Sequence, residues 1–196
     1  MDTDAVFGDL HLVPRELREI LRWLRREIGP RHGPARREPP LELLSWGRQY
    51  LPEHFRRPPS AMHVWLAAQL DRTRTARGVK INVLGPRGSA KSTVATLAYP
   101  LRAALECAEP YIWIISDTRH QACAHLENIK AELTDNSRLA ADYPARAGRG
   151  PVWRTGQIVL PGGAAIEAYG TGQRIRGRRH GASRPTLILC DDLQIS

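Results

Sequence analysis

Apolar residues recur at every third or fourth position in the first part of the chain, and this spacing predicts helices. The first helix is predicted over residues 15–28, directly after Pro14, with an apolar face opposite a row of arginines. Its apolar face consists of Leu17, Ile20, Leu21, Leu24 and Ile28. Two more helices are predicted over 41–50 and 60–74, and Ser60 is placed to cap the second of these.

Later in the chain the pattern changes to short apolar runs that are too brief for helices. These runs cover 79–84, 111–115 and 186–190, and each is bounded by Gly, Pro or polar residues, as buried strands commonly are. Helices are predicted between them, over 91–107 and 119–133. The order strand, helix, strand, helix predicts an α/β domain with a largely parallel sheet flanked by helices.

A different strand pattern, in which apolar and polar residues alternate, covers residues 153–160 and 164–169. The three residues between the two runs are Pro161, Gly162 and Gly163, which are typical of a turn. The sequence therefore predicts a β-hairpin inserted before the last strand.

The length of 196 residues suits one domain with a sizeable core, preceded by a small helical appendage. Residues 31–40 mix Pro, Gly and Arg without periodicity, which predicts a linker or surface loop. We therefore expect an N-terminal helical region and linker over residues 1–58 and an α/β core over residues 59–196.

Charge adds one feature to this picture. The chain has 29 Lys and Arg against 20 Asp and Glu, a formal net charge of +9, and such a field attracts polyanions, nucleic acid among them. Much of the excess lies in arginine clusters, namely Arg25-Arg26, Arg36-Arg37, Arg56-Arg57 and the segment 174–179. Composition alone does not separate a binding surface from a genome that uses arginine as its default cation.

The number of cysteines and the hydropathy of the chain indicate the cellular compartment in which the protein is expected to fold. Cys107, Cys123 and Cys190 are too few and too scattered for a disulfide framework, which favours a reducing, cytosolic setting. The N-terminus does not resemble a signal peptide, and no stretch approaches the roughly 20 apolar residues that span a bilayer. We expect a soluble, intracellular protein without a membrane partner.

The strongest motif lies between the predicted strand 79–84 and the helix that follows it. It consists of Gly85, Pro86, Arg87, Gly88, Ser89, Ala90, Lys91, Ser92 and Thr93. A loop of this type wraps phosphate oxygens with backbone N–H groups, extends a lysine to the terminal phosphates and supplies a hydroxyl to Mg²⁺. Lys91 and Ser92 fill the two side-chain roles, so the motif predicts binding of ATP and Mg²⁺.

The loop departs from the usual pattern at Ala90, where glycine is expected. The backbone there must adopt its conformation with a Cβ present, and a methyl group is the smallest side chain that could replace glycine. We therefore keep the phosphate-loop interpretation.

A second motif is the apolar run 187–190 followed by Asp191 and Asp192. A hard divalent cation on nucleotide phosphates requires a carboxylate at the carboxyl end of a strand beside the phosphate loop. Asp191 is the expected metal carboxylate, acting with Ser92, and Asp192 stands where a second acid could polarise the attacking water. Aspartate also favours turns, so this interpretation depends on the upstream loop.

Three features in this order resemble a phage large terminase: the phosphate loop with Arg87 inside it, the arginine-rich segment 172–179, and the run 184–192. The resemblance covers residues 51–194, approximately. In that family an ATPase domain of the P-loop NTPase fold drives double-stranded DNA into a procapsid, and a separate nuclease domain cuts the DNA. The resemblance implies an ATPase domain that stops just after its Walker B strand, without the nuclease domain.

The resemblance also implies roles for individual residues. Lys91 and Ser92 would hold phosphate and Mg²⁺, Asp191 would be the Walker B acid, and Arg87 would act on the γ-phosphate. We expect Asp192 to be the catalytic acid, because an amide such as Gln194 cannot accept the proton of an attacking water.

The implied partners are double-stranded DNA, the portal, the small terminase subunit and further copies in a ring, all in the cytoplasm of a phage host. ATP hydrolysis by this chain alone is expected to be weak, because force generation needs later elements and neighbouring subunits. The segment with Arg174, Arg176, Arg178 and Arg179 could contact the γ-phosphate, a neighbouring subunit or DNA.

Two other functions stay open at this point. One is a different nucleic-acid-dependent P-loop ATPase, helicase-like or associated with transposition, and the other is a non-catalytic DNA-binding remnant. A zinc site at His120, Cys123 and His125 is not expected, because these residues spread around a predicted helix and no fourth ligand is evident. Phe55 or Trp65 could stack on adenine, but buried packing is the favoured use of both.

Overall fold

The computed structural model describes residues 41–193, and the helix and linker predicted over 15–28 and 31–40 lie outside them. The helical elements are α2 (Leu43–Tyr50), α3 (Ala61–Arg72), the π-helical η3 (Thr93–Ala98), α4 (Tyr99–Leu105), α5 (Arg119–Asp135) and α6 (Ser137–Asp142). The strands are β1 (Tyr111–Ser116), β2 (Val152–Arg154), β3 (Gln157–Val159), β4 (Ala165–Gly170) and β5 (Leu187–Asp191).

The strands form one five-stranded sheet in the order β2-β3-β4-β1-β5. Strand β1 pairs in parallel with β4 and with β5, whereas β3 pairs antiparallel with both β4 and β2. The fold is therefore α/β with a mixed sheet, compatible with a Rossmann-like arrangement. The expectation of a largely parallel sheet is correct for β1, β4 and β5 and wrong for the two strands that the hairpin adds.

The predicted hairpin is present, but its two arms differ from the expectation. Residues 153–160 divide into β2 and β3 around a tight turn at 155–156. The second arm, β4, is an interior strand of the main sheet, because Ile166 lies opposite Ile158 of β3 on one side and Ile112 of β1 on the other. The hairpin of β3 and β4 precedes the last strand in the sequence, as predicted, and β2 and β3 extend the sheet beyond β4.

The first predicted strand, residues 79–84, is wrong. This segment is extended but pairs with none of the strands in the described part of the chain. Ile81 and Val83 pack against the core, whereas the side chains between and after them are exposed, with Leu84 at 89%. An apolar, β-branched run indicates an extended backbone, but ladder pairing also requires a partner edge in register, which local sequence does not specify.

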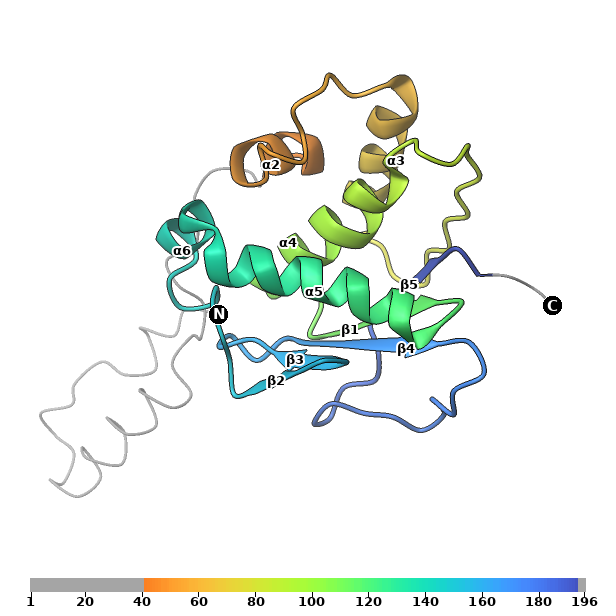
Figure 1. Cartoon of the computed structure of the whole chain (residues 1–196), viewed down its shortest axis with the longest axis vertical. Helices are drawn as coiled ribbons and strands as arrows, with labels where there is room; N and C mark the ends of the chain where they lie inside the picture. The colour runs from red at the N-terminus through yellow and green to blue at the C-terminus, as the bar shows by residue number, and fades with distance from the viewer. Residues whose placement is uncertain (1–40, 194–196) are drawn as a thin grey trace, which may run out of the picture. The chain divides into compact units, whose positions relative to one another are not determined.

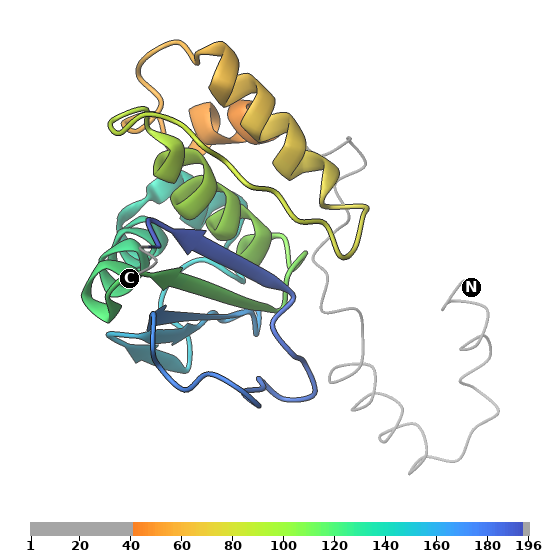
Figure 2. The ribbon, with the colours of Figure 1, turned by 90° about the vertical axis from the view of Figure 1, so that its right-hand side faces the viewer.

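The helices gather on one face of the sheet, and residues 171–186 cross the other face (Figures 1 and 2). On the helical face, Ile112, Ile114 and Ile166 pack with buried residues of the helices in the main core. On the opposite face, a smaller cluster is formed by Tyr111, Trp113, Val159, Ala165 and Tyr169, against which Ile175 packs. The helix-free face is therefore covered by an arginine-rich loop.

Helix α2 belongs to the main core. Its buried residues Leu43, Trp46 and Tyr50 share one cluster with residues of the sheet and of α4 and α5. Tyr50 also stacks near Tyr143, at 5.6 Å between ring centroids. The predicted division placed residues 1–58 in an N-terminal region, whereas the buried side chains of α2 pack in the main core.

Helices α3 and α5 confirm the predicted segments 60–74 and 119–133. Ser60 caps α3 as expected, in a capping box with His63. At the other end of α3, the Asp71 carboxylate accepts the backbone N–H of Leu43 at 2.8 Å and the Arg102 guanidinium at 2.9 Å. Helix α3 is therefore anchored at both ends.

None of the helices within residues 41–193 has the length and apolarity to cross a membrane.

Candidate nucleotide-binding site

The predicted phosphate loop lies between the extended segment 79–84 and a helical stretch that begins at Lys91. Its backbone turns through left-handed conformations at Gly88, with φ +74°, and at Ala90, with φ +54°. Ala90 thus adopts the conformation expected of the missing glycine, at a cost of about 1 kcal/mol for a residue with a Cβ. The nine predicted residues form one continuous junction from loop to helix.

The Lys91 side chain folds back into this loop. Its Nζ donates to the carbonyl oxygens of Gly85 at 3.0 Å and Pro86 at 2.8 Å, and to Ser89 Oγ at 3.2 Å. The loop is narrow here, because a Cβ added at Gly85 would lie 3.2 Å from Lys91 Cδ. An ammonium group held by loop oxygens can exchange these acceptors for phosphate oxygens without leaving the loop.

Helix α3 supports the loop through His63, a residue that the sequence analysis did not select. His63 Nδ1 lies 3.1 Å from the backbone nitrogen of Ser60, so it accepts that N–H, and in a neutral ring the proton is on Nε2. His63 Nε2 accordingly donates to the carbonyl oxygen of Ser89 at 2.7 Å. This bond fixes the loop just before Ala90.

The structure brings together the two motifs that the sequence analysis assigned to Mg²⁺. Asp191 ends β5 and lies on the same sheet face as Leu187 and Leu189, which pack against the core. The Ser92 side chain, at the start of the helical stretch after the loop, contributes to lowering the pKa of the Asp191 carboxyl. Thr96 Oγ1 donates to Asp191 Oδ2 at 3.4 Å, and His125 Nε2 lies 3.1 Å from the same oxygen.

The electrostatics of Asp191 favour a carboxylate anion. Its pKa is lowered, chiefly because His125 hydrogen-bonds the carboxylate, and Ser92 and Thr96 contribute to the lowering. Partial burial raises the pKa but does not outweigh these contacts. Asp191 is thus ionised at neutral pH, as a metal ligand must be.

The two residues predicted to act on the γ-phosphate and the water lie at the surface. Arg87 is exposed in the phosphate loop. Asp192 is exposed directly after β5, in a left-handed conformation with φ +49°. The backbone thus leaves the strand conformation at Asp192. As a result the Asp192 carboxylate is exposed, whereas the Asp191 carboxylate is half-buried.

The arginine-rich segment starts where β4 ends, beside the end of β1, since Thr171 Oγ1 donates to the Asp117 carbonyl oxygen at 2.7 Å. Gln173 holds the first turn by accepting the Gly170 N–H at 2.8 Å. Arg178 lies over the Tyr169 ring at 5.5 Å. The exposed arginines of the segment are Arg174, Arg176, Arg178 and Arg179.

Asp191, Thr96 and His125 form what we call the carboxylate cluster. Thr96 and His125 were not predicted as functional residues. A usable signal exists for His125. A helix that follows a parallel strand begins at the carboxyl edge of the sheet, so a polar residue in its second turn can face that edge.

His120, Cys123 and His125 do not converge, and within residues 41–193 no group of three His, Cys, Asp or Glu side chains gathers to hold a metal. A Mg²⁺ ion bound mainly through phosphates and water needs only one or two protein ligands.

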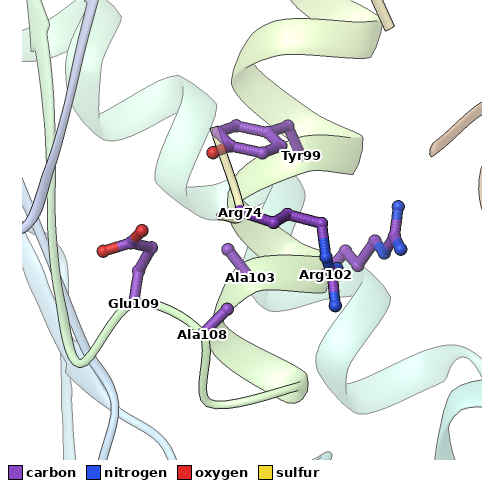
Figure 3. Close-up of a pocket in the computed structure, with 6 residues that line it drawn as sticks. All are labelled: Arg74, Tyr99, Arg102, Ala103, Ala108 and Glu109. Carbon is purple, nitrogen blue, oxygen red and sulfur yellow. The ribbon is translucent and has the colours of Figure 1, made fainter. Parts of the chain in front are cut away.

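A small pocket involves a different set of residues, at the end of α3, along α4 and in the turn before β1 (Figure 3). It is lined by Arg74, Tyr99, Arg102, Ala103, Ala108 and Glu109. Its charges are already paired: Arg102 binds Asp71 and Glu106, Arg74 also binds Glu106, and Arg77 binds Glu109. We interpret it as a structural ion-pair network around Arg102, which is 2% exposed.

No protein-family model matches this chain, and neither a curated protein nor a solved structure matches it. The functional assignment therefore depends on the residues and geometry described above.

Proposed function

We propose that this chain binds ATP with Mg²⁺ and acts as the ATPase motor domain of a phage large terminase, which drives double-stranded DNA into a procapsid. The observation that supports the nucleotide site best is the contact between Asp191 and the helical stretch that contains Ser92: Thr96 Oγ1 donates to Asp191 Oδ2 at 3.4 Å, and Ser92 contributes to the lowered pKa of Asp191. Ser92 and Asp191 are far apart in the sequence, and each was predicted as a ligand of the same cation from a separate motif.

The proposed chemistry assigns one task to each residue of the site. Lys91 exchanges its loop acceptors for the terminal phosphate oxygens, while the loop N–H groups and the start of the helix bind the remaining charge. Ser92 and Asp191 would hold Mg²⁺, whose contribution is to neutralise charge on the β- and γ-phosphates.

The remaining two residues act on the reacting groups. Asp192, exposed and adjacent to the metal carboxylate, orients the attacking water and accepts its proton. Arg87 stabilises the charge that develops on the γ-phosphate. Both roles are carried over from the resemblance, and exposure leaves both side chains free to reach a nucleotide.

The packaging role is supported by the order of the phosphate loop, the segment 172–179 and the run 184–192, together with the net charge of +9. The segment 171–186 contains Arg174, Arg176, Arg178, Arg179 and Arg184 and no acidic residue. Such a segment suits phosphate backbones. Portal, small subunit and a ring of copies complete the proposed assembly.

The test is equilibrium binding of a fluorescent ATP analogue with and without Mg²⁺. Wild type should bind with assistance from Mg²⁺, and Lys91→Ala should weaken binding by about tenfold or more, because a charge-assisted contact to phosphate is lost. Lys80→Ala is the matched control, since Lys80 is exposed and outside the loop. Equal binding by wild type and Lys91→Ala would refute the site.

The same proteins separate packaging from the alternative ATPase. Stimulation of ATP hydrolysis by double-stranded DNA supports the packaging motor. Stimulation by single-stranded DNA alone would favour a helicase-like enzyme, and DNA binding without any nucleotide affinity would favour a non-catalytic remnant.

A further inference from the structure

The Asp191 carboxylate is held from two helices at once. Its Oδ2 contacts Thr96 Oγ1 of η3 at 3.4 Å and His125 Nε2 of α5 at 3.1 Å. The side chains of His125 and Asp191 are 26% and 17% exposed, so this contact is partly shielded from water. His125 is the closer of the two partners.

The strand itself gives Asp191 little support. Strand β5 is an edge strand whose one neighbour is β1 (Figure 2), and the chain leaves the extended conformation at Asp192. In the register of the two strands Ser116 lies beside Asp191, on the same face. Ser116 Oγ is nevertheless buried without a hydrogen-bond partner within residues 41–193, so β1 does not hold the carboxylate. The orientation of Asp191 consequently depends on the helices.

Helix α5 provides a rigid platform for His125. Thr118 caps it, accepting the Gln121 N–H at 3.2 Å. Ala122, Leu126 and Ile129 on the same helix are fully buried in the main core. Because both its start and its apolar face are fixed, the backbone of His125 has little freedom to move relative to the sheet.

We infer that His125 is a positioning residue that fixes the orientation of the Asp191 carboxylate at the end of β5 and thereby sets the affinity of the nucleotide site for its divalent cation. This inference rests on the proposed function. The lowered pKa of Asp191 agrees with it, since the His125 contact is the main cause of the lowering. His125 acts through Asp191 and does not bind the cation or the nucleotide, so its loss should leave metal-free nucleotide binding unchanged.

The decisive experiment compares wild type with His125→Ala and His125→Gln. For each protein, the Mg²⁺ concentration that gives half-maximal assistance to binding of the fluorescent ATP analogue is measured, together with the affinity without metal. His125→Ala should raise the Mg²⁺ requirement by about 10- to 100-fold, the usual effect of losing a residue that orients a metal ligand. His125→Gln should stay close to wild type, because its amide N–H can replace the imidazole donor.

A matched control is His120→Ala, which removes an exposed histidine from the first turn of the same helix. It should change neither quantity. Thermal unfolding of all variants shows whether each is folded, and the glutamine variant keeps the test valid if alanine unfolds the chain. An unchanged Mg²⁺ requirement in His125→Ala would overturn the inference, and so would a glutamine variant as weak as alanine, because imidazole would then be a direct ligand.

Failure of the proposed function is recognised separately. If wild type binds no nucleotide with or without Mg²⁺, the proposed function fails. Direct binding of Mn²⁺, followed by electron paramagnetic resonance, then decides the inference. Weaker Mn²⁺ binding in His125→Ala than in wild type supports positioning of Asp191, and equal binding refutes it.

Discussion

The phosphate loop and the carboxylate cluster are built in different ways. The four side-chain hydrogen bonds of Lys91 and Ser89 lie within residues 85–91. Asp191 is instead contacted by Thr96 of η3 and His125 of α5, which are distant from it in the sequence. A contiguous motif can therefore be recognised from the sequence, but the environment of its distant partner emerges only from the fold.

The comparison also predicts different sensitivities. Substitutions in the phosphate loop should weaken nucleotide binding directly. Substitutions in the carboxylate cluster should weaken binding of the cation and loosen the packing of the helices on the end of β5.

The largest effect is expected for Asp191→Asn. Loss of the anion should weaken Mg²⁺-assisted binding of the ATP analogue by more than the roughly 100-fold expected at most from a supporting residue. Metal-free binding should be preserved, because the loop is intact. Asp192→Asn is the control: it should lower hydrolysis while leaving Mg²⁺ assistance in place. Equal Mg²⁺ titrations for Asp191→Asn and wild type would contradict the role given to β5.

A smaller effect is expected in the loop. Ala90→Gly should raise the free energy of unfolding by up to about 1 kcal/mol, because Ala90 has a positive φ that glycine adopts without strain. Ala131→Gly, at an exposed position inside α5, should instead lower it by about 1 kcal/mol. Urea denaturation measures both. A loss of stability in Ala90→Gly would show that the left-handed conformation is absent in solution.

The smallest effect is expected on the free energy of unfolding at acidic pH. Since the pKa of Asp191 is lower in the folded chain than the unfolded value of about 3.9, its contribution to stability is present above that pH. The contribution is lost as the pH falls through the folded pKa. The difference in unfolding free energy between wild type and Asp191→Asn should therefore be constant from pH 7 to about pH 5 and shrink toward pH 3. Urea denaturation at several pH values checks this, and a difference that persists undiminished at pH 3 would disprove the lowered pKa.

Local signals predicted helices α3 and α5 and the turn between residues 85 and 91. Ser60 caps α3 and Ala90 takes the conformation of the glycine that it replaces. These features depend on neighbouring residues only, so periodicity, capping and turn chemistry are sufficient to find them.

Features that depend on strand pairing or helix packing could not be predicted in the same way. The run 79–84 is extended but unpaired, and β4 is an interior strand because its partners lie on both sides. His125 and Thr96 reach Asp191 only because α5 and η3 meet at the end of β5. The place of His125 in the second turn of a helix after a parallel strand indicates the sheet edge, but it does not identify Asp191 as the partner, because the contacts join segments that the fold alone brings together.

Helix α3 connects the loop to a remote part of the core. Its first turn binds the Ser89 carbonyl through His63, and its last turn binds the start of α2 and Arg102 through Asp71. A helix of 12 residues is a stiff rod of about 18 Å. The carbonyl oxygen of Ser89 and the start of α2 are therefore held at a fixed separation by one rigid element.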